Sequence, residues 1–466
     1  MMKIIITKFF YLSIKNKRKW KYRFYIICLL LSLGFSQSPS QIYFMELDSS
    51  VIQDSLSALL RNNFDDFHEY RLKQFSLHDS IKAFYALRPI EARIDTLIFS
   101  NHFDISPQYL HHIFSLKTEN TIGQNVVNER LRNIQKLYPF ILEIPNYRFG
   151  RISEEKMGLQ IDFSPEFQNY FSALVGANQG IDLGWDVTGE IEMHFENTFH
   201  RTETIGFHWQ KLDSLSQNLR FEYEDPFPFG QPIGINLSYE RNVINGHFSE
   251  ISSQLGLSIN TTILGQISLA VESSDIFATA QGKDLGFMSN HSKSMVAKIS
   301  AQNLNHRWLP SKGFNYYLEG KIGNLQDGLS YGLSFKGKTI LPVRGKWIST
   351  FQLWGEKFAI KNSEVPESRK IRFGGLETLK GFREDEFLSD WVVIPEMKLS
   401  YILSEDLHFI SFIQSGWFHD ASSPKSSYGF GISQINKNAV IEIHYGLEMA
   451  SLFSDGNIHI RYSSRF

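Results

Sequence analysis

The chain has 466 residues, a formal net charge of −2 and one cysteine. A chain of this length exceeds one ordinary hydrophobic core and predicts two or three structural units. The balanced charge excludes a chain-wide nucleic-acid footprint, so we expect no nucleic-acid partner.

The N-terminal residues have the order of a secretory signal peptide. Basic side chains gather between Lys15 and Arg23, an apolar run covers residues 24–34, and polar residues follow. The run is shorter than the roughly 20 residues that a spanning helix needs, so we expect a cleaved signal over residues 1–36. A short amphipathic anchor is the alternative. Cys28, the one cysteine, lies within the run. Cleavage of the signal peptide would therefore leave a chain without disulfides or thiolate metal sites.

An exported chain of this composition has few ways to cross a membrane. No stretch after residue 40 reaches 18 consecutive apolar residues, the length that indicates a transmembrane helix. Aromatic residues nevertheless make up 14% of the chain, and 39 of its residues are phenylalanine. Only helices and closed barrels satisfy the backbone polar groups inside lipid, so a closed β-barrel is the remaining solution.

Residues 37–91 are predicted to form a helical periplasmic segment, which is either a linker or a degenerate domain. Apolar side chains recur there at one-turn spacing, a pattern that favours helices. These side chains are Ile52, Leu56, Leu59, Leu60, Ile81, Phe84 and Leu87.

Residues 92–165 follow the order strand, helix, helix, strand, strand. The first strand alternates over residues 94–98, and Ser106 followed by a proline marks the start of the first helix. Pro139 ends the second helix, and two β segments follow up to Phe163. One small α+β domain accounts for this pattern.

From Phe167 onward the hydrophobic pattern has a period of 2. In one run, Ile191, Met193 and Phe195 alternate with glutamate or histidine, and similar runs of about 10 residues recur to the C-terminus. This is the length of a tilted membrane-spanning strand. We predict a transmembrane antiparallel β-barrel of about 16 strands over residues 166–466, whose polar face lines a wet lumen. A soluble β-sandwich array is the alternative, but it does not explain charged residues on one face of nearly every strand.

The last strand has the clearest alternation. Its apolar face is expected to contact lipid and comprises Ile458, Ile460, Tyr462 and Phe466. A terminal phenylalanine on an amphipathic strand resembles the C-terminal β-signal by which outer-membrane proteins reach their assembly machinery. The predicted location is therefore the bacterial outer membrane, with the N-terminal domain in the periplasm.

The sequence contains one pattern of a catalytic type, and its context argues against catalysis. Residues 328–332 match G-x-S-x-G, but a nucleophile elbow needs a helix after the serine, and here the alternation of a strand continues. No H-E-x-x-H motif and no phosphate-binding loop occurs. We expect a protein that is not an enzyme and that holds no cofactor and no metal.

A long segment broken by glycines, residues 372–387, interrupts the strand pattern between the eleventh and twelfth expected strands. It resembles the sixth-loop motif of the BamA/TamA superfamily of outer-membrane assembly barrels, in which a Gly-Gly segment precedes Arg-Gly-Phe or Arg-Gly-Tyr and the loop folds back into the lumen. Residues 185–192, 305–314 and 454–466 resemble the second strand, the mid-barrel turn and the final strand of this family. Residues 92–165 resemble its periplasmic POTRA domain.

The resemblance implies that the tip of this segment enters the lumen. The motif residues are Gly374, Gly375, Leu379, Lys380, Gly381 and Phe382. In the family an arginine stands where this chain has Lys380, and it pairs with acidic residues on the barrel wall. The matching wall positions fall on Ser400 and Gln414, which are uncharged, and Glu396, on the same face as Ser400, is the candidate substitute partner. A lysine offers a point charge in place of the bidentate fork of arginine.

By resemblance, the chain is expected to insert or export other outer-membrane chains. The expected route is a weak seam between the first and last strands, at residues 167–177 and 457–466, because an unpaired edge is a template for another strand. The expected partners are outer-membrane lipid, unfolded outer-membrane or secreted client chains, and periplasmic chaperones or lipoproteins. A translocator or pore for one dedicated secreted partner is the alternative, because only one clear POTRA-like domain precedes the barrel.

Overall fold

The fold is that of a computed structural model. It describes residues 41–44, 53, 56, 68–76, 82–89, 93–99, 105–114, 124–152, 156–179, 185–211, 215–325, 328–419, 421–449 and 451–465. The expected signal peptide at residues 1–36 and the terminal Phe466 lie outside these residues. The chain divides into two compact units, residues 1–64 with 68–89, and residues 65–67 with 90–466.

The first unit contains a small antiparallel sheet in the order β1-β3-β2. Its strands are β1 (Gln41–Phe44), β2 (His68–Ser76) and β3 (Lys82–Pro89). The helical prediction for residues 37–91 is wrong for the three strands, and Phe84 and Leu87 lie in β3. Of the described residues in that range, Gln53 and Leu56 are helical. Short apolar runs do not distinguish a helix from a strand, and the pairing of β2 with β3 decides the outcome. The remaining residues of that prediction lie outside the described residues: Ile52, Leu59, Leu60 and Ile81.

The second unit begins with a three-stranded sheet packed with two helices. Its elements are β4 (Arg93–Phe99), α2 (Pro107–Ile113), α3 (Gln124–Leu137), β5 (Asn146–Arg151) and β6 (Lys156–Asp162). Their order is the one that the sequence predicts. β6 lies in the centre, parallel to β4 and antiparallel to β5. Apolar residues of the helices and of β6 form one core, which includes Leu131, Leu159 and Ile161. No helix among the described residues is long and apolar enough to cross a membrane.

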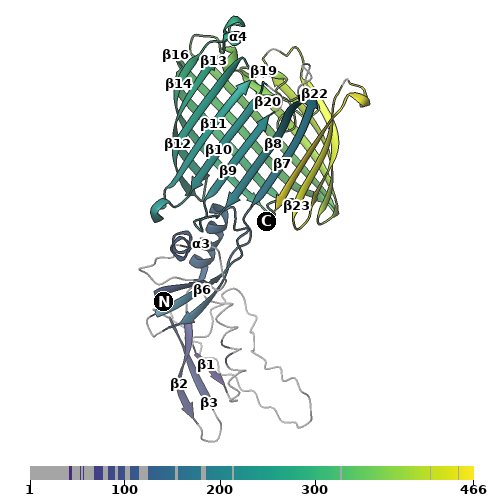
Figure 1. Cartoon of the computed structure of the whole chain (residues 1–466). Coiled ribbons are helices and arrows are strands. Elements are labelled where there is room, and N and C mark those ends of the chain that lie inside the picture. Colours follow the sequence, from purple (N-terminus) through teal and green to yellow (C-terminus); the bar gives the residue numbers. More distant parts are fainter. Residues whose placement is uncertain are drawn as a thin grey trace, which may run out of the picture. The chain divides into compact units, whose positions relative to one another are not determined.

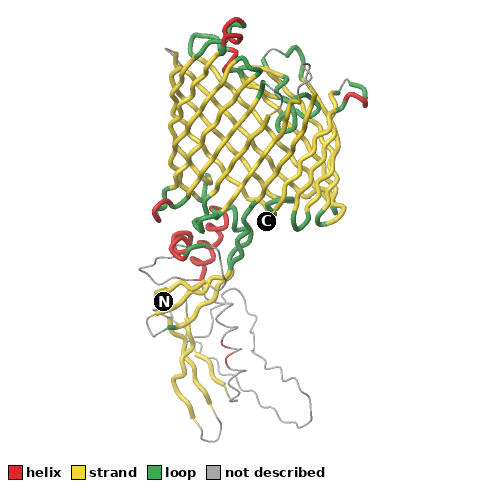
Figure 2. The backbone as a smooth tube through the Cα atoms, viewed as in Figure 1, coloured by secondary structure: helices red, strands yellow, loops and turns green. Residues whose placement is uncertain are grey.

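The rest of the second unit is a closed antiparallel barrel of 16 strands that follow the order of the chain (Figure 1 and Figure 2). The first eight strands are β7 (Tyr170–Gln179), β8 (Trp185–Glu196), β9 (Thr204–Lys211), β10 (Gln217–Asp225), β11 (Gly234–Ile244), β12 (Phe248–Thr261), β13 (Gly265–Ala278) and β14 (Asn290–Leu304). The last eight are β15 (Gly313–Leu325), β16 (Gly328–Arg344), β17 (Trp347–Ile360), β20 (Trp391–Ser404), β21 (Leu407–Phe418), β22 (Lys425–Ile435), β23 (Ala439–Glu448) and β24 (Asn457–Arg465). The prediction of an antiparallel barrel of about 16 strands is confirmed.

Successive side chains of each barrel strand point alternately outward and into the lumen. On β13, the outward residues Leu269 and Val271 are 64% and 58% exposed, whereas Ser268 and Ser274 face the lumen and are buried. Polar residues therefore collect inside the barrel and apolar residues outside. The G-x-S-x-G pattern at residues 328–332 lies in the extended strand β16, so no nucleophile elbow forms there.

The two ends of the barrel segment meet at one rim. β7 begins and β24 ends there (Figure 1), because an even number of antiparallel strands returns the chain to its starting side. Residues 361–390, between β17 and β20, leave the opposite rim, and we call them the lumen loop. Residues 305–312, between β14 and β15, lie at the rim of the chain ends, and we call them the base turn.

Candidate functional site

The lumen loop folds back into the barrel. It contains three short elements, η2 (Glu367–Arg369), β18 (Ile371–Phe373) and β19 (Phe387–Ser389), and the last two pair as a hairpin. Between these strands, Gly374, Gly375 and Gly381 have φ angles of 132°, 84° and 91°. Other residues rarely adopt such angles, so the glycines let the segment turn sharply and approach the wall closely.

Lys380 at the tip of the loop is held by the wall of β20 and β21. Its Nζ lies 2.7 Å from Glu396 Oε2, and the two side chains are 9% and 1% exposed. The ring of Phe412 lies 5.3 Å from the same nitrogen, and Lys398 lies 3.5 Å from the other carboxylate oxygen. A buried ammonium needs an anionic partner to offset its lost hydration, and Glu396 provides one. One strong bond to a carboxylate thus stands in place of an arginine fork.

Gln414, an uncharged side chain, completes the pocket with three hydrogen bonds. Its Oε1 accepts from the backbone N–H of Lys380 at 2.8 Å. Its Nε2 donates to Glu396 Oε2 at 2.5 Å and to the carbonyl of Thr378 at 3.1 Å. Ser400 is buried on the same wall, but the described hydrogen bonds of the loop tip to β20 and β21 go to Glu396 and Gln414. Two of the three wall residues named from the sequence therefore meet Lys380.

The apolar residues of the motif are buried within the loop. Leu379 and Phe382 belong to a core cluster completed by Ile371, Phe373, Val392, Ile394 and Phe418. The ring of Phe382 meets Phe387 of β19 edge-on, with ring centroids 5.1 Å apart. Truncating a buried aromatic side chain typically costs about 3–5 kcal/mol. The loop is therefore joined to β20 and β21 by an apolar cluster in addition to the polar contacts of Lys380.

The loop tip also reaches the last strands of the barrel. Gly381 lies so close to Gly446 of β23 that a Cβ on Gly446 would come 2.8 Å from the Gly381 nitrogen. Asn457 of β24 donates from Nδ2 to the Gly381 carbonyl at 3.0 Å. Arg461 of β24 forms an ion pair with Glu377. These contacts join the loop to the strand at which the barrel closes.

The pKa values of Glu377 and Glu384 in the loop are shifted in opposite directions. Desolvation favours the neutral form of Glu377, but the charges of Arg461, Lys336 and Lys380 together lower its pKa. Burial and the neighbouring Asp385 carboxylate raise the pKa of Glu384 to about 7. Glu377 is therefore charged at neutral pH, whereas Glu384 changes its charge there.

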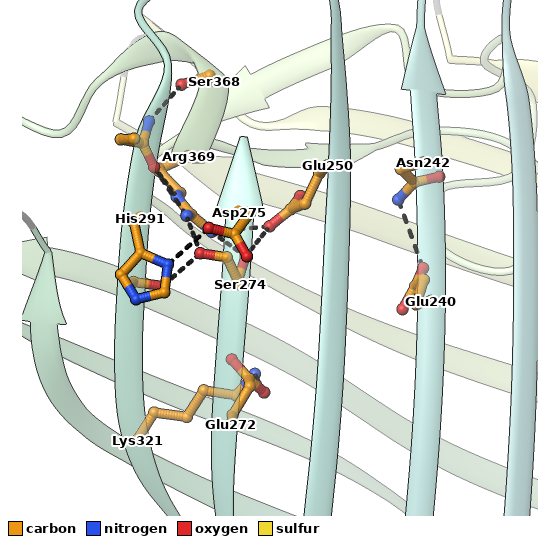
Figure 3. Close-up of polar contacts among 12 residues, drawn as sticks. Glu240, Asn242, Glu250, Glu272, Ser274, Asp275, His291, Lys321, Ser368 and Arg369 are labelled. Atoms are coloured by element: carbon orange, nitrogen blue, oxygen red, sulfur yellow. Dashed lines mark hydrogen bonds and ion pairs between the residues drawn. The ribbon is translucent and has the colours of Figure 1, made fainter. Parts of the chain in front are cut away.

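A second anchor holds the lumen loop to the wall of β12, β13 and β14. The guanidinium of Arg369 in η2 lies beside Glu250 of β12 and Ser274 of β13 (Figure 3). It donates to Glu250 Oε1 at 2.7 Å, to Ser274 Oγ at 2.6 Å and to Asn290 Oδ1 at 2.7 Å. The Arg369 side chain is 9% exposed. Because arginine stays charged in proteins, its burial depends on these acceptors.

The barrel closes between β24 and β7 with very little backbone pairing, and we call this junction the seam. Among the described residues, the paired positions are Ser464–Phe171 and Arg465–Tyr170. In contrast, β23 and β24 pair over eight residues and β7 and β8 over ten. The hydroxyl of Ser172 adds a hydrogen bond to the carbonyl of Tyr462 at 2.5 Å. The seam lies between the strands at which the sequence places it.

The residues of the expected C-terminal β-signal lie on the seam strand β24. Ile458, Ile460 and Tyr462 point outward and are 67%, 55% and 50% exposed. They form the apolar outer face that the sequence pattern predicts. The fourth residue, Phe466, lies outside the described residues.

Sequence reasoning missed the arginines that hold the loop. Arg369 and Arg461 are single charges in the sequence, and their partners come from distant strands, so no spacing rule marks them. The burial of Arg369 is visible only in the structure. Among the described residues, no group of three or more His, Cys, Asp or Glu side chains could hold a metal ion.

Comparisons with known proteins find similarity in structure alone. No family model and no curated protein sequence matches the chain. BamA from Haemophilus ducreyi lacking POTRA domains 1-3 is similar in fold, with a TM-score of 0.55 and 12% identity over 91% of this chain and 94% of that chain. CdiB from Escherichia coli has a TM-score of 0.57 and 12% identity over 90% and 84% of the two chains. CdiB from Acinetobacter baumannii has a TM-score of 0.55 and 13% identity over 90% and 81%. The barrel is therefore of the BamA and CdiB type in its fold.

Breaking the Lys380–Glu396 pair should loosen the lumen loop. Lys380→Ala leaves a buried carboxylate without its nearest cation, a change that typically costs about 3–5 kcal/mol. On a gel, we expect the folded band of the purified variant to shift to the unfolded position after heating to a lower temperature than the wild type needs. We also expect trypsin to cut the variant faster than the wild type after Arg383. In a double-mutant cycle with Glu396→Gln, the combined loss should be smaller than the sum of the single losses. Strict additivity would contradict a direct pair.

Removing the Arg369 anchor should broaden the position of the loop. Spin labels on cysteines at the exposed positions Arg383 and Ser454, in a Cys28→Ser background, measure the distance from the lumen loop to the connection between β23 and β24. We expect a narrow distance distribution for the wild type and a broad one for Arg369→Ala. Lys370→Ala removes a neighbouring charge that forms none of the described ion pairs, and it should leave the distribution narrow. An unchanged distribution in Arg369→Ala would mean that the anchor does not position the loop.

Proposed function

We propose that the chain is an outer-membrane protein assembly or insertion factor of the BamA/TamA type that acts through the seam of its barrel. The observation that carries the proposal is the seam itself, with two backbone pairs where the adjacent junctions have eight and ten. Strand edges with unpaired backbone groups are templates for a further strand. In this proposal, a client strand pairs with the edge of β24 or β7 and leaves into the membrane as its own barrel forms.

The proposed location is the bacterial outer membrane, with the N-terminal domain in the periplasm. The apolar outer face and the polar lumen support it, because this is how a membrane barrel divides its side chains between lipid and water. In this proposal, the protein is not an enzyme and uses no cofactor. The free energy for insertion comes from the backbone hydrogen bonds and the lipid contacts that a client gains on folding.

We further propose that residues 92–165 are a POTRA-like domain that receives clients. Its described sheet has β4 and β5 at its edges, and an extended chain adds to such an edge by β-augmentation. Ile98 on β4 is 49% exposed and offers an apolar contact beside that edge. The proposed partners are unfolded outer-membrane or secreted chains, and periplasmic chaperones or lipoproteins that deliver them.

A second candidate function is translocation of one dedicated secreted partner, or conduction through the lumen. The observation that favours it is the number of receiving domains, since the described residues contain one α+β domain of POTRA-like order. A single domain of this kind suits a narrow range of clients.

Locking the seam should stop client assembly. Phe171 and Ser464 are partners across the seam, so cysteines at these positions are placed to form a disulfide. In cells that depend on the Phe171→Cys/Ser464→Cys variant, we expect the oxidised seam to lower the amounts of other outer-membrane barrels, and a reductant to restore them. The control pair Phe430→Cys/Tyr445→Cys locks β22 to β23, which are already paired along their length, and should change nothing.

The pattern of loss separates the candidate functions. Broad loss of barrels supports an assembly factor, and loss of one secreted protein supports a translocator. Unchanged amounts of all clients, together with conductance in planar bilayers, support a pore. Unchanged amounts in the oxidised seam variant would in any case contradict a role for the seam in assembly.

A further inference from the structure

The base turn is a rigid segment that is stabilised from within. The side chains of Asn305 and His306 each accept two backbone hydrogen bonds from later residues of the turn, at 2.9 to 3.1 Å. Side chains that bond the backbone of their own turn fix its conformation. The residues between them and the next strand, Arg307 and Trp308 in particular, are thus held in place before they meet a partner.

Arg307 binds the beginning of the barrel segment. Its guanidinium pairs with Glu196 Oε1 of β8 at 2.5 Å and donates to Gln168 Oε1 at 3.2 Å. Gln168 in turn donates from Nε2 to the Arg307 carbonyl at 2.8 Å and from its backbone N–H to Glu196 Oε2 at 2.8 Å. The Arg307 and Glu196 side chains are 6% and 13% exposed. The three residues form a closed and largely dry network beside the first strand.

Trp308 contacts both residues of the last seam pair. Its ring lies edge-on to Tyr170 of β7, with centroids 5.7 Å apart. The guanidinium of Arg465 of β24 lies 4.7 Å from the centre of the same ring. Tyr170 and Arg465 are Cα partners across the seam. One indole therefore touches both strands, through an aromatic contact on one side and a cation–π contact on the other.

These contacts cross the base of the lumen. β14 and β15, which the base turn connects, are the eighth and ninth strands of the barrel, whereas the seam joins the last strand to the first. The turn has eight residues, although two residues suffice to join antiparallel strands. The contacts at the seam explain why the turn is longer than a simple connection and why it extends across the base of the lumen.

We propose that the base turn is an inner clamp of the seam, in which Arg307 and Trp308 are positioning residues that hold the end of β24 against β7. The clamp supplies side-chain contacts where the seam lacks backbone pairs. It keeps this end closed while the rest of the seam is free to separate. The role of the clamp in assembly rests on the proposed function. Closure of the seam, however, is a property of the purified barrel and is measured without a client.

The rate of disulfide formation across the seam tests the clamp. In purified Phe171→Cys/Ser464→Cys protein with Cys28→Ser, the clamp holds the two cysteines in register, so oxidation should be fast. Adding Arg307→Ala and Trp308→Ala should slow oxidation by about tenfold, which corresponds to about 1.4 kcal/mol of lost closure. A folded alanine variant that oxidises at the wild-type rate would overturn the clamp.

Matched variants separate the clamp from a general loss of structure. Lys312→Ala removes a charge from the same turn and should leave the rate unchanged, as should moving the cysteines to Phe430 and Tyr445 in the clamp variant. Arg307→Lys keeps the charge and Trp308→Phe keeps a ring, so each should give an intermediate rate. If the alanine variant does not fold, the two conservative variants decide the question. Oxidation at the wild-type rate in both Arg307→Lys and Trp308→Phe would overturn the clamp. Because no client is present, the result does not depend on the client-assembly test.

Discussion

The seam is the constraint on which the rest of the barrel depends. A strand surrounded by hydrocarbon has no water for its backbone N–H and C=O groups, and a barrel satisfies these groups by pairing each strand with two neighbours. Here β24 pairs with β23 over eight residues but with β7 over two. Other contacts must offset the missing pairs if the barrel is to stay closed.

Two segments approach the seam strands from opposite rims, and one of them, the base turn, contacts both strands. The lumen loop brings Glu377 and Gly381 to β24, and the base turn brings Trp308 to the last seam pair. Neither segment connects strands of the seam. The loop is itself fixed at two places, by Arg369 on β12 to β14 and by Lys380 on β20. The seam strands are therefore contacted from inside by two segments that come from other parts of the wall. We call the lumen loop the outer brace and the base turn the inner brace.

The barrel could be predicted from the sequence because alternation with a period of 2 records which face of each strand meets lipid. The same alternation puts Glu396 on the inner wall, within reach of Lys380. It also puts Arg461 on the inner wall, but it does not identify the partner of this residue. It says nothing about Arg307 or Arg369, which lie in connections between strands and have partners on distant strands. The helical prediction for β2 and β3 fails for a related reason, since their structure depends on pairing with each other and not on local spacing.

The ion pairs of the two braces differ in how far they are buried. Glu377 and Arg461 in the outer brace are 56% and 33% exposed, whereas Arg307 and Glu196 in the inner brace are 6% and 13% exposed. Exposed ion pairs contribute about 0–1 kcal/mol and are screened by salt. A buried pair is screened much less, and removing one partner costs about 3–5 kcal/mol. The inner brace therefore rests on the more deeply buried ion pair, and it is also the brace that contacts both strands of the seam, through Trp308.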